Sequence, residues 1–320
     1  MLTQEAVVKL CAPFPWFGGK GAMSTIVWRR FGDTPNYVEP FCGSLAVLLG
    51  RPVFEGNRTE TVNDADAFLS NFWRALQADP QAVAEHADWP VNEVDLHARH
   101  LWLVNVGRKH VEKLREDPDY YDAKIAGWWV WGCCQWIGSG WCHHPEWQQL
   151  PHLGNEGMGI HRPTQKLPHL GDAGRGDLLE YFALLARRLR RVRVCCGDWS
   201  RVCGPTPTVK QGLTSVFLDP SYTDKATRKS ALYATDDESI GREVRDWAVE
   251  HGEDSRMRIA LCGYEGEYDM PETWECVAWK ARGGFGSQGK GKTNGRANAR
   301  RERIWFSPHC LKTEQRRLFQ

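Results

Sequence analysis

The strongest constraint on the fold is an alternation of strand and helix patterns that occurs at both ends of the chain but not between them. Near the N-terminus, Tyr37-Val38 and residues 60–63 are short predicted strands, and residues 65–76 place their apolar side chains on one helical face. The alternation stops near residue 80 and returns at Asp177. This pattern is typical of an α/β protein whose parallel sheet is covered by helices.

The second half of the predicted sheet follows the interruption. Residues 177–190 have the pattern of an amphipathic helix, as do residues 240–251, for which Ser239 is a candidate N-cap. The strands of this half are predicted at residues 192–197, 215–219, 258–263, 275–280 and 303–308. Strands from both ends of the chain therefore belong to one sheet, with helices on both of its faces.

The interruption predicts an inserted subdomain. It holds helical pieces followed by a stretch rich in Trp, Gly, His and Pro, and a long loop of this kind inside a compact domain is usually functional or disordered. We predict a catalytic domain formed by residues 1–80 and 177–320, and a mainly helical, loop-rich insertion formed by residues 81–176.

Composition excludes several classes of protein. The content of 42% hydrophobic and 25% charged residues is ordinary for a globular protein and excludes a wholly disordered chain. No apolar run approaches the length of about 18 residues that spans a bilayer, and the first residues lack an apolar signal segment, so we expect a cytoplasmic protein without a membrane partner. The net charge is +1, so any binding of nucleic acid would depend on local basic patches.

The cysteines predict reduced thiols rather than disulfides or a metal site. Their number is eleven, which is odd, and no signal peptide accompanies them. Cys133-Cys134 and Cys142-His143-His144 are runs of adjacent residues, whose side chains point apart and suit zinc poorly. We therefore predict no metal. Six of the sixteen tryptophans lie between Trp128 and Trp147, and we expect them to form the core of the insertion.

The segment VFLDPSY at residues 216–222 is the strongest candidate for a catalytic site. An apolar strand ends in Asp219 and Pro220, and Tyr222 follows. A carboxylate at the carboxyl end of a parallel strand lies where open α/β sheets bind ligands. Proline lacks an N–H, so the turn offers carbonyls; with the tyrosine ring, these groups could accept hydrogen bonds from an exocyclic amine and stack on its base. The alternative is a strand that ends in an ordinary turn.

Two earlier segments suit a nucleotide-like ligand. The turn VEPFCGS follows the first strand, and its glycine would let the backbone approach a ligand closely. Asp64 ends the next strand about 20 residues later, where dinucleotide-binding folds place a carboxylate on ribose hydroxyls. The alternatives are an ordinary strand–helix turn for the first segment and, for Asp64, the N-cap of a helix that begins at Ala65. The candidate contacts in the turn are Glu39, Pro40, Phe41 and Gly43.

A basic, glycine-rich segment lies near the C-terminus. From Lys280 to Arg303 it holds eight Lys and Arg residues and one acid, Glu302. Glycines permit close approach to a phosphate backbone, and clustered cations give binding that weakens steeply with salt. We expect it to contact DNA phosphates through Lys290, Lys292, Arg296 and Arg300. The alternative is a solvated hairpin loop.

In combination, these segments resemble the Dam-type DNA adenine-N6 methyltransferases, in particular those carried by phages and prophages. The family opens with a Trp-x-Gly-Gly-Lys-like loop and continues with Val-Glu-Pro-Phe-x-Gly, an acid after the second strand, a Gly-Asp-aromatic step after the third, and Asp-Pro-Pro-Tyr. The matching residues, in the same order, are Trp16–Lys20, Val38–Gly43, Asp64, Gly197–Trp199 and Asp219–Tyr222. The resemblance covers most of the chain, and the insertion occupies the family's place between the second and third strands.

The resemblance implies a Rossmann-like sheet that uses S-adenosylmethionine to methylate the N6 amine of an adenine flipped out of double-stranded DNA. The insertion would then recognise the target sequence, and the protein would act as a monomer in a bacterial or phage-infected cell. The implied catalytic residues are Asp219, Pro220 and Tyr222. The implied cofactor contacts are Trp16, Lys20, Glu39, Pro40, Phe41, Gly43, Asp64, Asp198, Trp199 and Asp219.

Two departures from the family keep alternatives open. Ser44 and Leu45 follow Gly43 where the family has another glycine, and Ser221 replaces the second proline of the catalytic motif. The same pocket chemistry would suit cytosine N4 or RNA. Ser221, with Lys225 and Arg228 nearby, would also suit a carboxylated S-adenosylmethionine as donor. An alternative of another class is a non-catalytic DNA-binding protein with a degenerate transferase fold.

Overall fold

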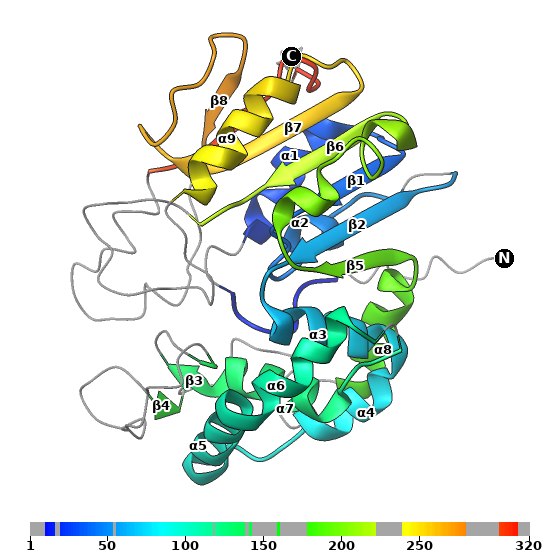
Figure 1. Ribbon diagram of the computed structural model, residues 1–320, viewed down its shortest axis with the longest axis vertical. Helices are drawn as coiled ribbons and strands as arrows, with labels where there is room; N and C mark the ends of the chain where they lie inside the picture. The colour runs from blue at the N-terminus through cyan, green and yellow to red at the C-terminus, as the bar shows by residue number, and fades with distance from the viewer. Residues whose placement is uncertain are drawn as a thin grey trace, which may run out of the picture.

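The protein is an α/β structure built on a mixed seven-stranded sheet with helices on both sides (Figure 1). The computed structural model describes residues 10–16, 20–53, 56–117, 119–137, 141–142, 159–160, 178–221, 239–279 and 301–312. The strands of the sheet are β1 (Asn36–Glu39), β2 (Thr59–Asp64), β5 (Val192–Cys196), β6 (Thr214–Leu218), β7 (Met257–Tyr264), β8 (Glu275–Ala278) and β9 (Glu302–Phe306). Each begins and ends within two residues of its predicted bounds, so the predicted strand positions are confirmed, but the sheet is mixed rather than parallel throughout.

The order of the strands places the two central ones where a ligand site is expected. The sheet runs β5-β2-β1-β6-β7-β9-β8, and its first five strands are parallel, whereas β9 is antiparallel to both neighbours. Counted along the chain, the parallel strands are in the doubly wound order 3-2-1-4-5, which reverses between β1 and β6. Open α/β sheets bind ligands at the carboxyl ends of the strands at this reversal.

Successive side chains of β1 point to opposite faces of the sheet, and each face has its own helices. Tyr37 belongs to the larger hydrophobic cluster, with residues of α1 (Ser24–Phe31), α2 (Ala46–Leu49), α3 (Ala67–Ala78) and α8 (Leu178–Leu189). Val38 belongs to the other cluster, with residues of α9 (Ile240–His251) and of the short helix η5 (Trp199–Val202). The remaining short helices of this part are η1 (Lys20–Ala22) and η6 (Val209–Gln211).

The described part of the insertion is mainly helical, as predicted. Its elements are α4 (Pro80–Ala87), α5 (Glu93–Trp102), η2 (Leu103–Gly107), α6 (Arg108–Val111), η3 (Glu112–Arg115), α7 (Ala123–Gln135) and the small pair β3 (Trp136–Ile137) and β4 (Gly159–Ile160). Asn71 of α3 exchanges two hydrogen bonds of 2.9 Å with the backbone of Asp122, the N-cap of α7. These helices lie beyond β5 in Figure 1 and share the larger cluster with α3.

Four of the six tryptophans expected to form the core of the insertion do so, whereas Trp128 is partly buried and Trp147 lies outside the described residues. Trp129, Trp131, Trp136 and Trp141 are buried, and Trp129 contacts Phe14 and Phe72 with ring centroids 5.2 and 5.8 Å apart. This core is therefore continuous with the N-terminal segment and with α3. All eleven cysteines are free thiols, which confirms that prediction. No described helix is long and apolar enough to cross a membrane.

The alternative role of Asp64, as the cap of a helix that begins at Ala65, is wrong. Helix α3 begins at Ala67, and its cap is Asp66, whose side chain accepts from the N–H groups of Phe68 and Leu69. Asp64 is therefore not the cap, because two more residues separate β2 from the helix than the pattern suggested. Ser239 is the N-cap residue of α9, as predicted, but its side chain makes no capping hydrogen bond; its hydroxyl donates to the Glu243 carboxylate at 2.8 Å.

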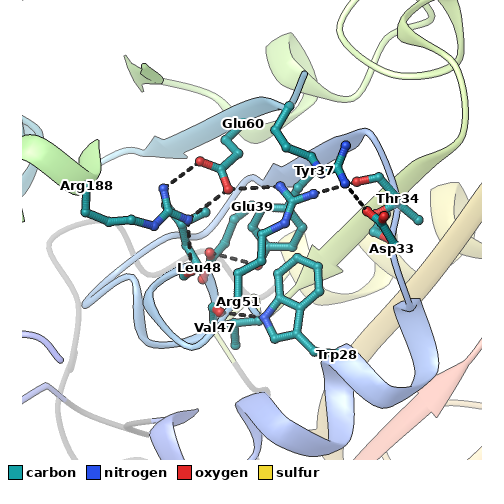
Figure 2. Close-up of polar contacts among 12 residues, drawn as sticks. Trp28, Asp33, Thr34, Tyr37, Glu39, Val47, Leu48, Arg51, Glu60 and Arg188 are labelled. Atoms are coloured by element: carbon teal, nitrogen blue, oxygen red, sulfur yellow. Dashed lines mark hydrogen bonds and ion pairs between the residues drawn. The ribbon is translucent and has the colours of Figure 1, made fainter. Parts of the chain in front are cut away.

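A buried ion-pair network joins helices to the amino end of β2 (Figure 2). Arg188 of α8 forms a bidentate pair with Glu60 at 2.7 and 2.8 Å, and Arg51 donates to the same carboxylate at 2.9 Å. Arg51 also stacks on Trp28 of α1 at 5.0 Å. Although burial acts to raise the pKa of Glu60, Arg188 and Arg51 hold it below its usual value. The network therefore fixes α1 and α8 relative to the sheet.

We expect Glu60→Gln to lower the free energy of unfolding by about 3 kcal/mol, because it leaves two largely buried guanidinium groups without their shared carboxylate. Urea denaturation at neutral pH measures this. Asp246→Asn is the control, since the Arg245–Asp246 pair is exposed and should contribute less than about 0.5 kcal/mol. Equal losses in the two variants would contradict a stabilising role for the network.

Candidate active site

The predicted site residues follow four neighbouring strands at one edge of the sheet. Glu39 ends β1, Asp64 ends β2, Asp198 follows β5 and Asp219 follows β6. These strands are parallel and adjacent in the order β5-β2-β1-β6, so their carboxyl ends meet at one edge. The structure thus brings together groups that are 180 residues apart in the chain, from Glu39 to Asp219.

Asn63 of β2, which was not among the predicted residues, ties the turns after β1 and β5 to its own strand. Its buried side-chain amide donates to the carbonyl of Pro40 at 3.1 Å and to that of Gly197 at 2.9 Å. The backbone carbonyl of Asn63 accepts from the N–H of Cys42 at 2.9 Å. The sequence carries no distinct signal for this role, because β2 (TETVND) is polar along most of its length.

Asp64 supports the turn after β1. Its carboxylate accepts from the N–H of Gly43 at 3.1 Å and from that of Asp66 at 3.0 Å. Burial raises the pKa of Asp64 to about 7, in spite of these donors. The observed role is therefore to hold the glycine turn, and a contact with ribose hydroxyls stays a prediction.

Gly43 is required by both its conformation and its surroundings. Its φ is +44°, and a Cβ at this position would lie 2.5 Å from Nε1 of Trp16. Its carbonyl accepts from the indole of Trp73 at 3.1 Å. Trp16, which was predicted from the N-terminal loop, thus lies directly on the turn after β1. Residues 17–19 of that loop lie outside the described residues.

An aromatic pair flanks the same edge. Phe41 and Trp199 are stacked, with ring centroids 6.2 Å apart and an angle of 28° between the planes. Trp199 is buried and meets Trp247 of α9 edge to face, whereas Phe41 is partly exposed. Asp198 is exposed and caps η5 by accepting from the N–H of Ser200 at 2.9 Å. The three predicted residues Phe41, Asp198 and Trp199 therefore lie at this edge, and the two rings form an aromatic surface between the turns.

Lys20 lies against the predicted catalytic carboxylate. Its Nζ is 3.3 Å from Oδ1 of Asp219 and 3.2 Å from Oε2 of Glu302, and it is 5.2 Å from the ring centroid of Trp279. Lys20 is buried, as is Glu302. The resemblance placed Lys20 in the N-terminal Trp-x-Gly-Gly-Lys-like loop as a cofactor contact, and Glu302 was noted only as the single acid of the basic segment. The structure brings both to Asp219.

Glu39 is buried beneath this edge of the sheet and does not reach the surface of the protein. The side chain is buried and accepts a hydrogen bond of 2.9 Å from the Tyr37 hydroxyl (Figure 2). Burial raises the pKa of Glu39 to about 8; the hydrogen bond opposes this rise, and the nearby charge of Asp219 adds to it. Glu39 is therefore mostly protonated at neutral pH, and its predicted contact with a cofactor stays a prediction.

The remaining predicted residues divide into two groups. Pro220 is buried directly after Asp219, and Ser221 is partly exposed. Tyr222, Lys290, Lys292, Arg296 and Arg300 lie outside the described residues. Within the described ranges, no three His, Cys, Asp or Glu side chains are placed to hold a metal ion. No family model matches the chain, and no curated protein matches its sequence.

We expect Gly43→Ala to destabilise the protein more than Gly266→Ala. Both glycines have positive φ, which costs alanine about 1–2 kcal/mol, but only at Gly43 would the new methyl group collide with Trp16. The collision should add about 1–3 kcal/mol. Urea denaturation of both variants separates the two effects, and equal losses would show that Trp16 does not pack on the turn.

The raised pKa of Glu39 predicts a pH dependence of stability. Between its ordinary value of 4.5 and about 8, the folded protein keeps a proton that the unfolded chain has lost, so the free energy of unfolding falls as pH rises through this window. The contribution is at most about 1.4 kcal/mol per pH unit. Glu39→Gln has no proton to lose and should flatten the curve between pH 5 and 8. Parallel curves for the two proteins would contradict the assignment.

Proposed function

We propose that the protein is a DNA adenine methyltransferase, which transfers a methyl group from S-adenosylmethionine to the N6 amine of an adenine flipped out of double-stranded DNA. The observation that carries the proposal is the position of Asp219 and Pro220. They follow β6 at the reversal of strand order, beside the glycine turn that follows β1. The sequence resemblance assigns these two segments to the catalytic motif and to the cofactor-binding motif.

The residues at this edge fit such a cofactor. The partly exposed ring of Phe41 offers a surface for an adenine, and Asp198 and Asp64 are carboxylates that suit hydroxyl and amino groups. Because Gly43 has no side chain, it can adopt the positive φ that this turn requires. When bound, S-adenosylmethionine supplies an electrophilic methyl group on a sulfonium.

Asp219 and Pro220 can activate the acceptor amine. The lone pair of an adenine amine is delocalised into the ring, which makes the nitrogen a poor nucleophile. Hydrogen bonds from the amine to the Asp219 carboxylate and the Pro220 carbonyl would localise that lone pair on the nitrogen. Positioning and electrostatics of this kind supply most of the rate gain in such reactions. Lys20, whose Nζ is 3.3 Å from Oδ1 of Asp219, forms an ion pair with the carboxylate that would accept these bonds.

The ends of the basic segment support contact with DNA at the same edge. Trp279 follows the carboxyl end of β8, and Arg301 precedes the amino end of the antiparallel β9. Both ends therefore lie at the edge that carries Asp219. The chain between them, residues 280–300, holds six Lys and Arg residues and no acid. We propose that it contacts DNA phosphates while the extruded base, whose unstacking costs a few kcal/mol, stacks on Tyr222.

The test is to incubate the purified protein with S-adenosylmethionine that carries a deuterated methyl group and with unmethylated plasmid DNA, then to analyse the nucleosides by mass spectrometry. We expect deuterated N6-methyladenine. Label in N4-methylcytosine, or in RNA offered in parallel, would assign the same chemistry to another acceptor. A carboxymethylated base, formed when a carboxylated S-adenosylmethionine is offered in a parallel reaction, would point to Ser221. No label in any base would contradict a transferase.

We expect Asp219→Ala to slow methyl transfer at least about 100-fold, because it removes the group that orients the amine. The melting temperature should change little, since Asp219 is partly exposed at the end of its strand. Asp246→Asn, on the exposed side of α9, is the matched control and should keep its rate. A variant that kept more than a tenth of the wild-type rate would show that the catalytic assignment is wrong.

A further inference from the structure

The direction of β9 brings an acid from the far end of the chain to the candidate site. Because β9 is antiparallel to β7, its first residue, Glu302, pairs with Tyr264 at the carboxyl end of β7. A parallel strand at this position would place its last residue, Phe306, at this edge instead. The reversed strand is thus the reason that Glu302 and Asp219 lie near one another.

Glu302 and Asp219 contact the same ammonium group. Nζ of Lys20 is 3.2 Å from Oε2 of Glu302 and 3.3 Å from Oδ1 of Asp219. The Lys20 side chain is 6% exposed and that of Glu302 is 7% exposed, whereas that of Asp219 is 21% exposed. The carboxylate that reaches solvent is therefore the one at the proposed substrate site, and the other two groups lie behind it.

Trp279 limits where Lys20 can lie. The ammonium is 5.2 Å from the centroid of its ring, and the backbone N–H of Trp279 donates to the carbonyl of Glu302 at 3.3 Å. A cation over an indole ring is attracted to its face. Glu302 therefore acts on Lys20 through its carboxylate and also helps to place the indole beside it.

The charge that moves in the proposed reaction gives Glu302 a function. As the bond between carbon and the amine nitrogen forms, the bond between carbon and sulfur breaks and its electron pair stays on sulfur. The positive charge of the sulfonium thereby passes to the nitrogen, which later loses a proton. If Asp219 were the only carboxylate beside Lys20, the ammonium charge would offset the negative charge that Asp219 presents to this nitrogen. Glu302 supplies a second negative charge, so that Asp219 still stabilises the cationic transition state.

We propose that Glu302 is a positioning residue for methyl transfer: it holds Lys20 and compensates its charge, so that the Asp219 carboxylate is fixed in place and keeps its negative charge toward the substrate amine. This inference rests on the proposed function. It assigns to an acid of the basic segment a role that is distinct from contact with DNA.

The test compares Glu302→Gln, Lys20→Met and the double variant with the wild type in single-turnover methyl transfer. We expect Glu302→Gln to lower the rate of transfer about 10- to 100-fold, since a displaced catalytic group costs up to about 100-fold. The dissociation constants for S-adenosylmethionine and for a DNA duplex should change less than about threefold. Because Glu302 acts through Lys20, the double variant should be no slower than Lys20→Met. The matched control is Glu275→Gln. Glu275 lies on the neighbouring strand β8 and pairs with Arg30 of α1, so this variant should keep the wild-type rate.

The outcomes separate this inference from the proposed function. An active wild type whose Glu302→Gln variant transfers at the same rate would overturn the inference alone, as would rate losses that multiply in the double variant. Loss of cofactor or DNA binding in proportion to rate would also overturn it, because it would show a binding role. If a single variant fails to fold, the double variant, in which neither buried charge is left behind, takes its place; a folded double variant with the wild-type rate would overturn the inference. A wild type without any transfer would overturn the proposed function first.

Discussion

The pairing of β1 with β2 on one side and with β6 on the other is the constraint on which the candidate site depends. Asn36 lies opposite Thr59 of β2 and Thr214 of β6, so all three strands begin at the same level and end at the same edge. Asn36 reinforces this pairing, since its buried amide donates to the Thr214 hydroxyl at 2.9 Å and to the carbonyl of Pro207 at 2.8 Å. A shift of register by one residue would turn Tyr37 and Glu39 together to the opposite face of the sheet and move the turns apart.

The buried acids at the two ends of this sheet have pKa values that are shifted in opposite directions. At the amino end, Glu60 is enclosed by two arginines and its pKa is lowered, as expected of a group that stabilises the fold in its ionised form. At the carboxyl edge, burial raises the pKa values of Glu39 and Asp64, so these carboxyl groups destabilise the fold when they ionise. A cluster of acids that is costly to ionise is typical of a binding or catalytic site.

The sequence predicted the elements of the fold better than their contacts. Strand positions and α3 followed from the periodicity of apolar residues, and the position of Asp219 after β6 followed from the strand that precedes it. The antiparallel direction of β9 could not be read in this way, because a short strand has the same pattern in either direction. For that reason the approach of Glu302 to Lys20 was not predicted. The role of Asn63 was missed because it depends on which turns the strand order brings together.

Photolabelling tests most directly the proposal that the edge between β1 and β6 binds the methyl donor. Ultraviolet irradiation of the protein with S-adenosylmethionine tritiated in its methyl group, followed by digestion and peptide sequencing, identifies the chain segments that contact the donor. We expect label in the peptides that contain Trp16, Phe41 or Trp199, and its loss when excess S-adenosylhomocysteine competes. Competable label confined to peptides of the insertion, such as those with Trp89 or Trp102, would contradict the account.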